Sequence, residues 1–248
     1  MRAITAVFAH PDDETFATGG TLAKYAEAGV RCSLYCATDG DAGRSSGIPF
    51  SSRAELGTIR RAELLDACGR LGVTVVEHGG HLDAALQAAD PEVVMRQIVS
   101  LLRRERPQVV LTFGPEGAPT GHLDHRAISR LATSAVLLAG TSAFPEQLEA
   151  GLAPHRPDRL CYVTWPIPGP GEAPRKEGQP IHIREPVSRW HPRKLDAFFA
   201  HRTQLDHQAY FEREAMPLTE DYFVVIGTPA PAGATGLFDG LTTVNGLR

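Results

Sequence analysis

The sequence of 248 residues lacks a long apolar run, a block of like charges and a CxxC pair. A membrane-spanning helix needs about 20 consecutive apolar residues, so no membrane span is predicted. The net charge is −4, from 25 Lys and Arg against 29 Asp and Glu, and no basic stretch offers the face that a nucleic acid would bind. These absences argue against a membrane-spanning or nucleic-acid-binding protein, whereas a polar or anionic small molecule remains a suitable partner.

The amino terminus carries no convincing secretory signal. Its short apolar run, residues 4–9, follows a single basic residue and has no clear small-residue cleavage site after it. We therefore expect a cytoplasmic protein. The four cysteines are expected to be buried free thiols rather than disulfides or a thiolate metal site, because none is paired in a CxxC motif.

Strand and helix signals alternate along the first 140 residues. Apolar runs rich in β-forming residues predict four strands, at residues 4–9, 32–37, 73–77 and 109–113. Apolar residues at helical spacing predict four helices, at residues 14–29, 52–71, 91–104 and 122–139. This alternation predicts an α/β fold with a Rossmann-like, doubly wound, mostly parallel sheet flanked by helices. Right-handed crossovers then place the carboxyl end of every strand at one edge, where such sheets bind ligands.

The second part of the chain is less regular. It contains two further predicted strands and one helix, at residues 159–165, 222–226 and 192–201. The stretch 166–186 is rich in proline and glycine, which predicts a loop. No internal repeat or linker divides the chain, so we expect a single domain over residues 1–226. A tail rich in Gly, Ala and Pro, residues 227–248, follows it with no assigned structure.

The loop after the first predicted strand concentrates charge. His10, Asp12, Asp13 and Glu14 fall within five positions. Like charges this close repel unless a cation or proton lies between them, and burying them unpaired is costly. A divalent metal resolves the conflict, and imidazole with carboxylate oxygen suits zinc. The other interpretation is a solvated turn with an aspartate capping the next helix, and spacing alone does not decide which of Asp12 and Asp13 would bind metal.

A second cluster, Gly-His-Leu-Asp-His, occupies residues 121–125 after the fourth predicted strand. His122 and His125 are three positions apart at a helix start, so both can face one cleft. The preceding strand ends at the same sheet edge as His10, so the two clusters can converge. Surface histidines with Asp124 as a helix cap are the alternative for this cluster taken alone. The two clusters together favour a metal centre.

The two clusters, Ala-His-Pro-Asp-Asp-Glu and Gly-His-x-Asp-His about 110 residues later, resemble the PIG-L/LmbE family of zinc-dependent N-acetylglucosaminyl deacetylases. That family includes the deacetylases of mycothiol and bacillithiol biosynthesis. Three further motifs share the resemblance, which spans residues 3–205: Thr-Asp-Gly-Asp-Ala-Gly at 38–43, Arg-Arg-Ala-Glu-Leu at 60–64 and Ala-His-Arg-Thr-Gln at 200–204.

The resemblance implies a role for each residue of the two clusters. One Zn²⁺ ion would be bound by His10, Asp13 and His125, with an open position for water and substrate. Asp12 would be the general base and His122 would help to stabilise the oxyanion. Asp124 would orient a ligand histidine. A site of two histidines and an aspartate also accepts iron or another divalent ion.

The substrate side of the site is less defined by the sequence. The resemblance implies that Arg60 and Asp83 contact the sugar, although each is also a common type of surface residue. His201 is expected near the rim of the site or as a structural histidine. Arg44 stands where some thiol-pathway members carry an acidic residue, which argues against a mycothiol-type substrate.

These observations predict a metal-dependent enzyme that hydrolyses an N-acyl, most simply N-acetyl, amide on an amino-sugar derivative such as an N-acetylglucosaminide. An amidase acting on a thiol conjugate or other non-sugar amide is one alternative, and a metal-stabilised small-molecule binding module is another. Asp12 favours catalysis, because a binding module needs no second carboxylate. The first strand-to-helix turn lacks G-x-G-x-x-G and holds carboxylates, which disfavours a nucleotide binder. A homo-oligomer is expected from the family resemblance.

Overall fold

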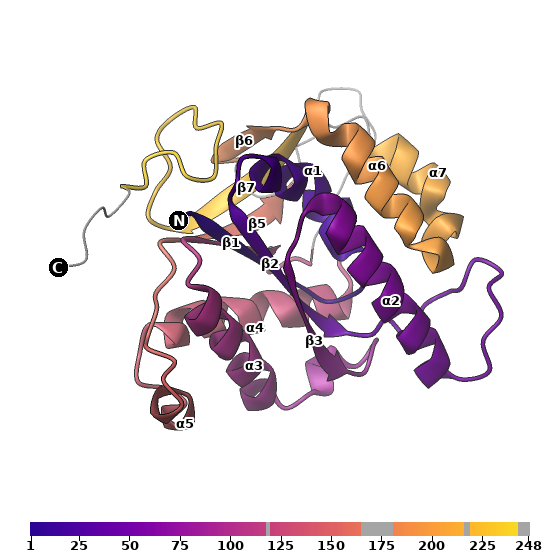
Figure 1. Cartoon of the computed structure of the whole chain (residues 1–248), viewed down its shortest axis with the longest axis horizontal. Helices are drawn as coiled ribbons and strands as arrows, with labels where there is room; N and C mark the ends of the chain where they lie inside the picture. The colour runs from indigo at the N-terminus through magenta and orange to yellow at the C-terminus, as the bar shows by residue number, and fades with distance from the viewer. Residues whose placement is uncertain (118–119, 165–180, 216–218, 243–248) are drawn as a thin grey trace.

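The structure is a computed structural model that describes residues 1–117, 120–164, 181–215 and 219–242. Within these residues, seven strands form one sheet in the order β3-β2-β1-β4-β5-β7-β6 (Figure 1). The strands are β1 (Ala3–Phe8), β2 (Arg31–Thr38), β3 (Val75–His81), β4 (Val109–Phe113), β5 (Arg159–Thr164), β6 (Ile183–Pro186) and β7 (Glu220–Gly227).

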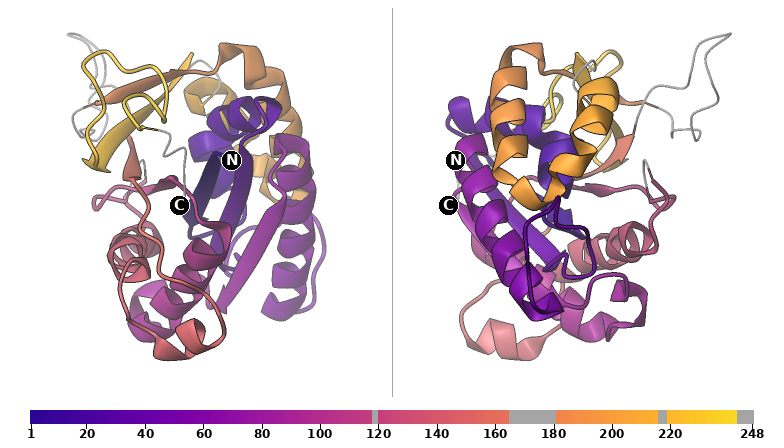
Figure 2. Two further views of the ribbon diagram at one scale, coloured as in Figure 1. Left: turned by 60° about the vertical axis from the view of Figure 1, so that its left-hand side comes forward. Right: turned by 90° about the vertical axis from the view of Figure 1, so that its right-hand side faces the viewer.

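Helices cover both faces of the sheet, as the alternating pattern predicts. The longer ones are α1 (Asp13–Glu27), α2 (Arg53–Leu71), α3 (Pro91–Glu105), α4 (Leu123–Ala139) and α6 (His191–Ala200). The shorter ones are η1 (Leu86–Ala88), α5 (Pro145–Glu149), η2 (Ser188–Trp190), η3 (Arg202–His207), α7 (Gln208–Tyr210) and η4 (Phe211–Ala215). Helices α1, α2 and α6 pack together over one face and α3 packs with α4 over the other, an arrangement that Figure 2 shows from two further sides.

The strand directions confirm a doubly wound, mostly parallel sheet. Strand β1 lies parallel to β2 and β4, β2 parallel to β3, and β4 parallel to β5. Strand β7 is antiparallel to both β5 and β6. The expectation that every strand ends at one edge is therefore wrong for β7, because the chain reverses direction after β6. It is correct for β1 to β5, and these strands position the site.

One predicted loop contains a strand. Within the stretch 166–186, residues Ile183–Pro186 form β6 at the edge of the sheet, with Ile183 and Glu185 buried and their neighbours exposed. A proline is tolerated at an edge strand because its missing N–H leaves no ladder bond broken inside the sheet. Trp165, predicted to end β5, and residues 166–180 of the predicted loop lie outside the described residues.

The described part of the tail, residues 228–242, has no helix or strand but packs on the rest of the molecule. Leu237 is fully buried. The buried guanidinium of Arg159, at the start of β5, donates hydrogen bonds to four carbonyl oxygens of this segment, those of Thr228, Pro229, Leu237 and Asp239. Residues 228–242 are therefore irregular in backbone yet held by specific contacts.

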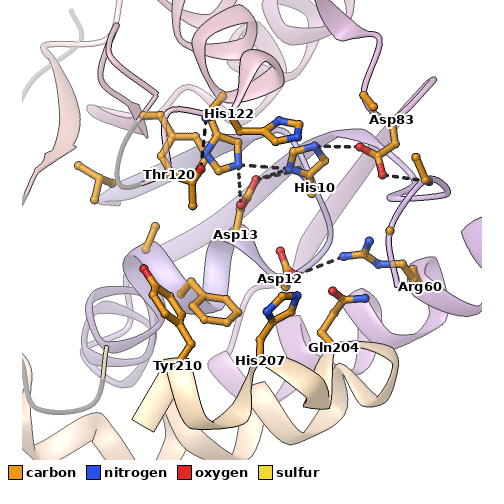
Figure 3. Close-up of a pocket in the computed structure, with 18 of the residues that line it drawn as sticks. His10, Asp12, Asp13, Arg60, Asp83, Thr120, His122, Gln204, His207 and Tyr210 are labelled. Atoms are coloured by element: carbon orange, nitrogen blue, oxygen red, sulfur yellow. Dashed lines mark hydrogen bonds and ion pairs between the residues drawn. The ribbon is translucent and has the colours of Figure 1, made fainter. Parts of the chain in front are cut away.

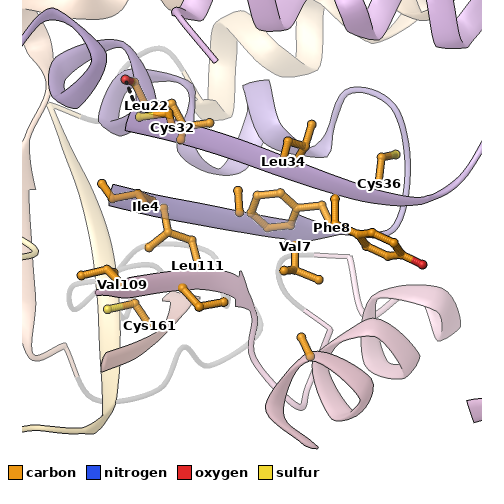
Figure 4. Packing of buried hydrophobic residues seen from close by; sticks show 14 of the residues in the cluster. Ile4, Val7, Phe8, Leu22, Cys32, Leu34, Cys36, Val109, Leu111 and Cys161 are labelled. Atoms are coloured by element: carbon orange, nitrogen blue, oxygen red, sulfur yellow. Dashed lines mark hydrogen bonds between the residues drawn. The ribbon is translucent and has the colours of Figure 1, made fainter. Parts of the chain in front are cut away.

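The core lies between the central strands and the helices. Ile4, Val7, Phe8, Leu34 and Leu111 are all buried there (Figure 4), and each fully buried side chain of this size contributes about 1.5–3 kcal/mol. All four cysteines are buried and unpaired, which confirms the prediction of free thiols. No helix among the described residues has the length and apolar character needed to cross a membrane.

Candidate active site

The carboxyl ends of the parallel strands border a cavity of about 670 Å³. The loop after β1 and the start of α4 bring the two sequence clusters together on one wall (Figure 3). Every residue that the sequence predicts for catalysis, metal binding or substrate binding lines this cavity: His10, Asp12, Asp13, Arg60, Asp83, His122 and His125. The remaining predicted residue, Asp124, is fully buried directly behind the wall.

Asp13 is the first residue of α1 and is anchored by the loop that precedes it. Its Oδ2 accepts hydrogen bonds from the backbone N–H of His10 at 2.8 Å and of Ala9 at 3.2 Å, while Oδ1 lies 3.2 Å from Nε2 of His125. Burial raises the pKa of Asp13, but His125 and His10 outweigh burial and lower this pKa far below its usual range. The carboxylate is therefore ionised at any physiological pH.

His10 has a different environment at each ring nitrogen. Its Nδ1 lies 3.2 Å from Nε2 of His125 and 3.4 Å from Oδ2 of Asp13. Its Nε2 lies 3.1 Å from Oδ1 of Asp83 and 3.3 Å from Oδ2 of Asp124. Two carboxylates on the Nε2 side favour a proton there, which leaves the lone pair of Nδ1 facing His125 and Asp13.

The charges around His10 favour a cation. Burial lowers the pKa of His10, but Asp124, Asp13 and Asp83 together raise it well above its usual value. A region that binds an extra proton this readily also attracts a metal ion.

The donor atoms fit one small divalent metal. His10 Nδ1, His125 Nε2 and the Asp13 oxygens lie 3.2–3.4 Å from one another. Ligands at 2.0–2.2 Å from a tetrahedral zinc are separated by roughly 3.3 Å. Ligand atoms of His10, His122 and His125 also lie within 4.8 Å of one another. The separations among His10, Asp13 and His125 are compatible with the predicted ligand set, and the group with His122 in place of Asp13 is an alternative.

A second group of possible ligands, His10 with Asp83 and Asp124, lies on the other side of the His10 ring. Both of its carboxylates already accept backbone hydrogen bonds. Asp124 accepts from the N–H groups of Ala84 and Leu86 at 2.7 and 3.0 Å, and Asp83 accepts from the N–H of Ala42 at 3.0 Å. This placement supports the predicted role of Asp124 in orienting His10, with Asp83 contacting the same nitrogen.

Asp12 lies beside the cluster and faces Arg60. Its Oδ2 is 3.2 Å from Nη2 of Arg60. Its backbone has φ 115° and ψ −27°, a region that residues other than glycine rarely adopt. Burial raises the pKa of Asp12 to about 6, against an opposing effect of Arg60. A carboxyl group whose pKa lies close to neutrality is suited to accept and return a proton.

His122 caps the amino terminus of α4. Its Nδ1 accepts the backbone N–H of Asp124 at 3.2 Å, and its ring centroid lies 4.9 Å from that of His10. Burial lowers the pKa of His122, as do the neighbouring His10 and His125. The ring is then neutral with Nδ1 as acceptor, so its Nε2–H is left as a donor at the cavity wall.

Arg60 and Asp83 are committed to contacts within the protein. Arg60 is 3% exposed, and it donates to the carbonyl oxygens of Gly40 at 2.8 Å and Pro11 at 2.6 Å. Only its Nε has no partner among the described residues. Asp83 has a pKa of about 2, because its contact with His10 outweighs the opposing effect of burial. Contact of either side chain with a substrate remains a prediction.

The opposite wall contains residues that sequence reasoning missed. Three residues of the segment after α6 line the cavity there: Gln204, His207 and Tyr210 (Figure 3). Phe16 of α1 also lines the cavity, with its ring centroid 6.3 Å from that of Tyr210. That segment consists of short 3-10, α- and π-helical turns, which have no clear apolar period to detect. The motif at residues 200–204 was the one available signal, since it begins this segment.

Comparisons with known proteins identify chains of related sequence and fold. A family profile, PIG-L, described as GlcNAc-PI de-N-acetylase, matches residues 5–136. The chain is 31% identical over 276 residues to the 1D-myo-inositol 2-acetamido-2-deoxy-alpha-D-glucopyranoside deacetylase of Rhodococcus opacus (strain B4), covering 91% of each protein. It is 30% identical over 204 residues to a probable N-acetyl-alpha-D-glucosaminyl L-malate deacetylase 2 of Bacillus anthracis, covering 82% of this chain and 81% of that protein.

A solved structure shares the architecture. The N,N'-diacetylchitobiose deacetylase from Pyrococcus horikoshii matches with a TM-score of 0.74 at 22% sequence identity, covering 92% of this chain and 84% of that chain. At this identity the likeness shows the fold alone, and it confirms the fold predicted from the sequence.

Proposed function

This chain belongs to the PIG-L family, and from that premise we propose that it hydrolyses the N-acetyl amide of an N-acetylglucosamine conjugate to acetate and a free amine. One observation carries the proposal. Asp12 lines the same cavity as the His10, Asp13 and His125 cluster but faces Arg60. The site thus has a carboxylate that is not among the proposed metal ligands and can transfer protons. A binding module does not need such a carboxylate.

We assign the metal ligands to His10 Nδ1, Asp13 and His125 Nε2, and the metal to zinc. The separations of these atoms and their chemistry support the assignment. When bound, the metal supplies Lewis acidity that makes water a better nucleophile and polarises the amide carbonyl. Asp124 and Asp83 hold the His10 ring so that Nδ1 keeps its lone pair.

The protein side chains then manage the protons of the reaction. Asp12 accepts a proton from the water whose oxygen attacks the amide carbon. The Nε2–H of His122 donates a hydrogen bond to the oxyanion of the tetrahedral intermediate. As the C–N bond breaks, Asp12 returns the proton to the leaving nitrogen, so that acetic acid and the neutral amine are formed and Asp12 is again a carboxylate. The acetic acid then gives its remaining proton to the amine or to solvent, which leaves acetate.

The cavity is large enough for more than one sugar ring. Its end away from the metal cluster is lined by Tyr210 (Figure 3) and by Phe16, whose ring centroid lies 6.3 Å from that of Tyr210. We place the sugar at the polar wall and the group attached to it at this apolar end. Two of the named relatives differ in that attached group, inositol in one and malate in the other, so its identity has to be measured.

The test is a panel assay with zinc-loaded protein. N-Acetylglucosaminides carrying inositol, malate, aryl and alkyl groups are incubated with the protein while primary amine is monitored. We expect amine from at least one member, loss of the signal after chelation, and recovery when zinc is restored. Absence of amine from the whole panel, with zinc bound stoichiometrically, would contradict the proposal.

A further inference from the structure

The motif at residues 200–204 contacts two of the other sequence motifs and the residue that follows a third, although the proposed chemistry gives it no role. It follows α6, far from the amino-terminal motifs in the sequence. Three of its side chains make these contacts: His201 Nε2 to Glu14 Oε1 at 2.8 Å, Thr203 Oγ1 to Glu63 Oε2 at 2.6 Å, and Gln204 Nε2 to the carbonyl oxygen of Arg44 at 3.0 Å.

The contact between His201 and Glu14 leads toward Asp12. Both side chains are completely buried. Oε1 of Glu14 accepts hydrogen bonds from His201 and from the hydroxyl of Thr15 at 2.6 Å. Oε2 of Glu14 accepts the backbone N–H of Asp12 at 3.0 Å. One carboxylate therefore links the buried histidine to the backbone of the base.

The backbone of Asp12 needs such support. Its φ of 115° is sparsely populated for a residue with a side chain, and a conformation of this kind persists only when the surroundings over-determine it. Several contacts supply the constraint. Glu14 accepts the backbone N–H of Asp12, and Arg60 donates to the Asp12 carboxylate and to the carbonyl oxygen of Pro11. The carbonyl oxygen of Asp12 accepts the N–H groups of Thr15 and Phe16. Without Glu14 the N–H of Asp12 loses its acceptor, so the positive φ loses one of its constraints and the carboxylate can turn away from the reacting atoms.

We propose that His201 and Glu14 are positioning residues for Asp12: His201 fixes the Glu14 carboxylate, and Glu14 holds the Asp12 backbone in the conformation that aims its side chain into the cavity. This inference rests on the proposed function in that Asp12 is the base. Under this proposal, His201 positions the base in addition to joining η3 to α1.

The alternative is that the His201–Glu14 contact only stabilises the fold. The Thr203–Glu63 contact of the same motif serves as the control for this alternative. Thr203 donates two hydrogen bonds to Glu63, one from its hydroxyl and one from its backbone N–H at 3.0 Å. Both residues are as buried as the first pair, and they join the same segment to α2. No hydrogen bond among the described residues links Glu63 to Asp12.

The experiment compares variants of the zinc-loaded full chain on the best substrate of the panel. His201→Leu removes the donor and Glu14→Leu removes the acceptor, so that one variant remains if the other fails to fold. His201→Gln keeps an N–H near the position of Nε2, and Thr203→Val is the matched control. We expect kcat to fall by about 10- to 100-fold in both leucine variants, a range typical of a catalytic group displaced by about 1 Å. KM and zinc stoichiometry should stay unchanged, with most of kcat retained in His201→Gln and Thr203→Val.

Equal losses of kcat in His201→Leu and Thr203→Val, or loss of zinc in place of kcat, would overturn the proposal. Crystal structures of the leucine variants provide a test that needs no substrate. We expect Asp12 to leave its positive φ, and an unchanged Asp12 refutes the positioning role. An inactive wild-type protein refutes the proposed function instead, and the crystal structures still decide whether His201 and Glu14 position Asp12.

Discussion

The two walls of the cavity are built in different ways. The wall with His10, Asp13 and His125 comes from the ends of strands and the first turns of helices, and its charged groups are fixed by backbone N–H groups and by one another. The wall with His207 and Tyr210 comes from short turns after α6, and Tyr210 is 38% exposed. The first wall is therefore preorganised for chemistry, whereas the second offers a mixed aromatic and polar surface that can vary with the substrate.

The largest expected effect tests the assignment of roles on the first wall. Asp12→Asn keeps the size of the side chain but removes the base, so kcat should fall by about 10²- to 10⁴-fold. Zinc content, measured by atomic absorption, should stay near one ion per chain. Loss of zinc with this substitution, and retention of zinc in Asp13→Asn, would show that the two aspartates exchange roles.

A smaller effect is expected for Asp124, which lies behind that wall and contacts His10. Asp124→Asn weakens the partner of His10 Nε2, so zinc affinity or activity should fall by about 10- to 100-fold. A competition titration against a chromophoric chelator measures the affinity. Asp66→Asn, on the exposed face of α2, is the control and should leave the affinity unchanged.

The second wall should affect binding of the substrate more than the chemical step. Tyr210→Ala removes an aromatic surface at the apolar end of the cavity. We expect KM to rise by about 10-fold for substrates with an apolar attached group, equivalent to about 1.4 kcal/mol, with kcat little changed. A fall in kcat at constant KM would mean that both walls serve the chemical step, and the distinction between them would be lost.

The smallest expected effect is the pH dependence of stability that comes from the His201–Glu14 pair, which joins the segment after α6 to α1. Burial lowers the pKa of His201, but Glu14 and Asp12 outweigh burial and the repulsion of Arg60 and raise this pKa above 6.5. The charged pair therefore stabilises the fold fully below pH 6.5, and this contribution is lost as pH rises through the folded-state pKa.

Urea unfolding at several pH values checks this sign. The free energy of unfolding of the wild type, relative to His201→Gln, should decrease between pH 6 and pH 9. An increase over the same interval would show that His201 is neutral in the folded protein.

The sequence predicted the first wall because its chemistry is local. His10 and Asp13 follow a buried strand directly, His122 and His125 start a periodic helix, and parallel strands bring such ends together. The sequence could not show that Asp83 reaches His10 Nε2, since that contact depends on the irregular path after β3. Nor could it show that Arg60 donates its hydrogen bonds to the carbonyl oxygens of Pro11 and Gly40. The sequence of a helix does not distinguish a buried arginine from an exposed one.

The second wall and the edge of the sheet were harder to predict for a different reason. Strand β6 has four residues and ends in proline, so it carries too little alternation to distinguish it from a loop. The segment from η3 to η4 changes helical period within a few residues, and no single period describes it. His201 was noted by its motif, but its partner Glu14 is 187 positions away in the sequence.

The contacts of the Arg159 guanidinium stabilise the molecule at the end of the sheet opposite the active site. Arg159 lies at the amino end of β5 and fastens the carboxy-terminal segment there, across the sheet from the strand ends that carry the chemistry. Changes to this segment, including fused tags or alternative termini, should therefore alter the melting temperature and leave turnover intact. In a protein arranged this way, substitutions at one edge of the sheet can change the stability of the fold while substitutions at the other edge change the substrate specificity.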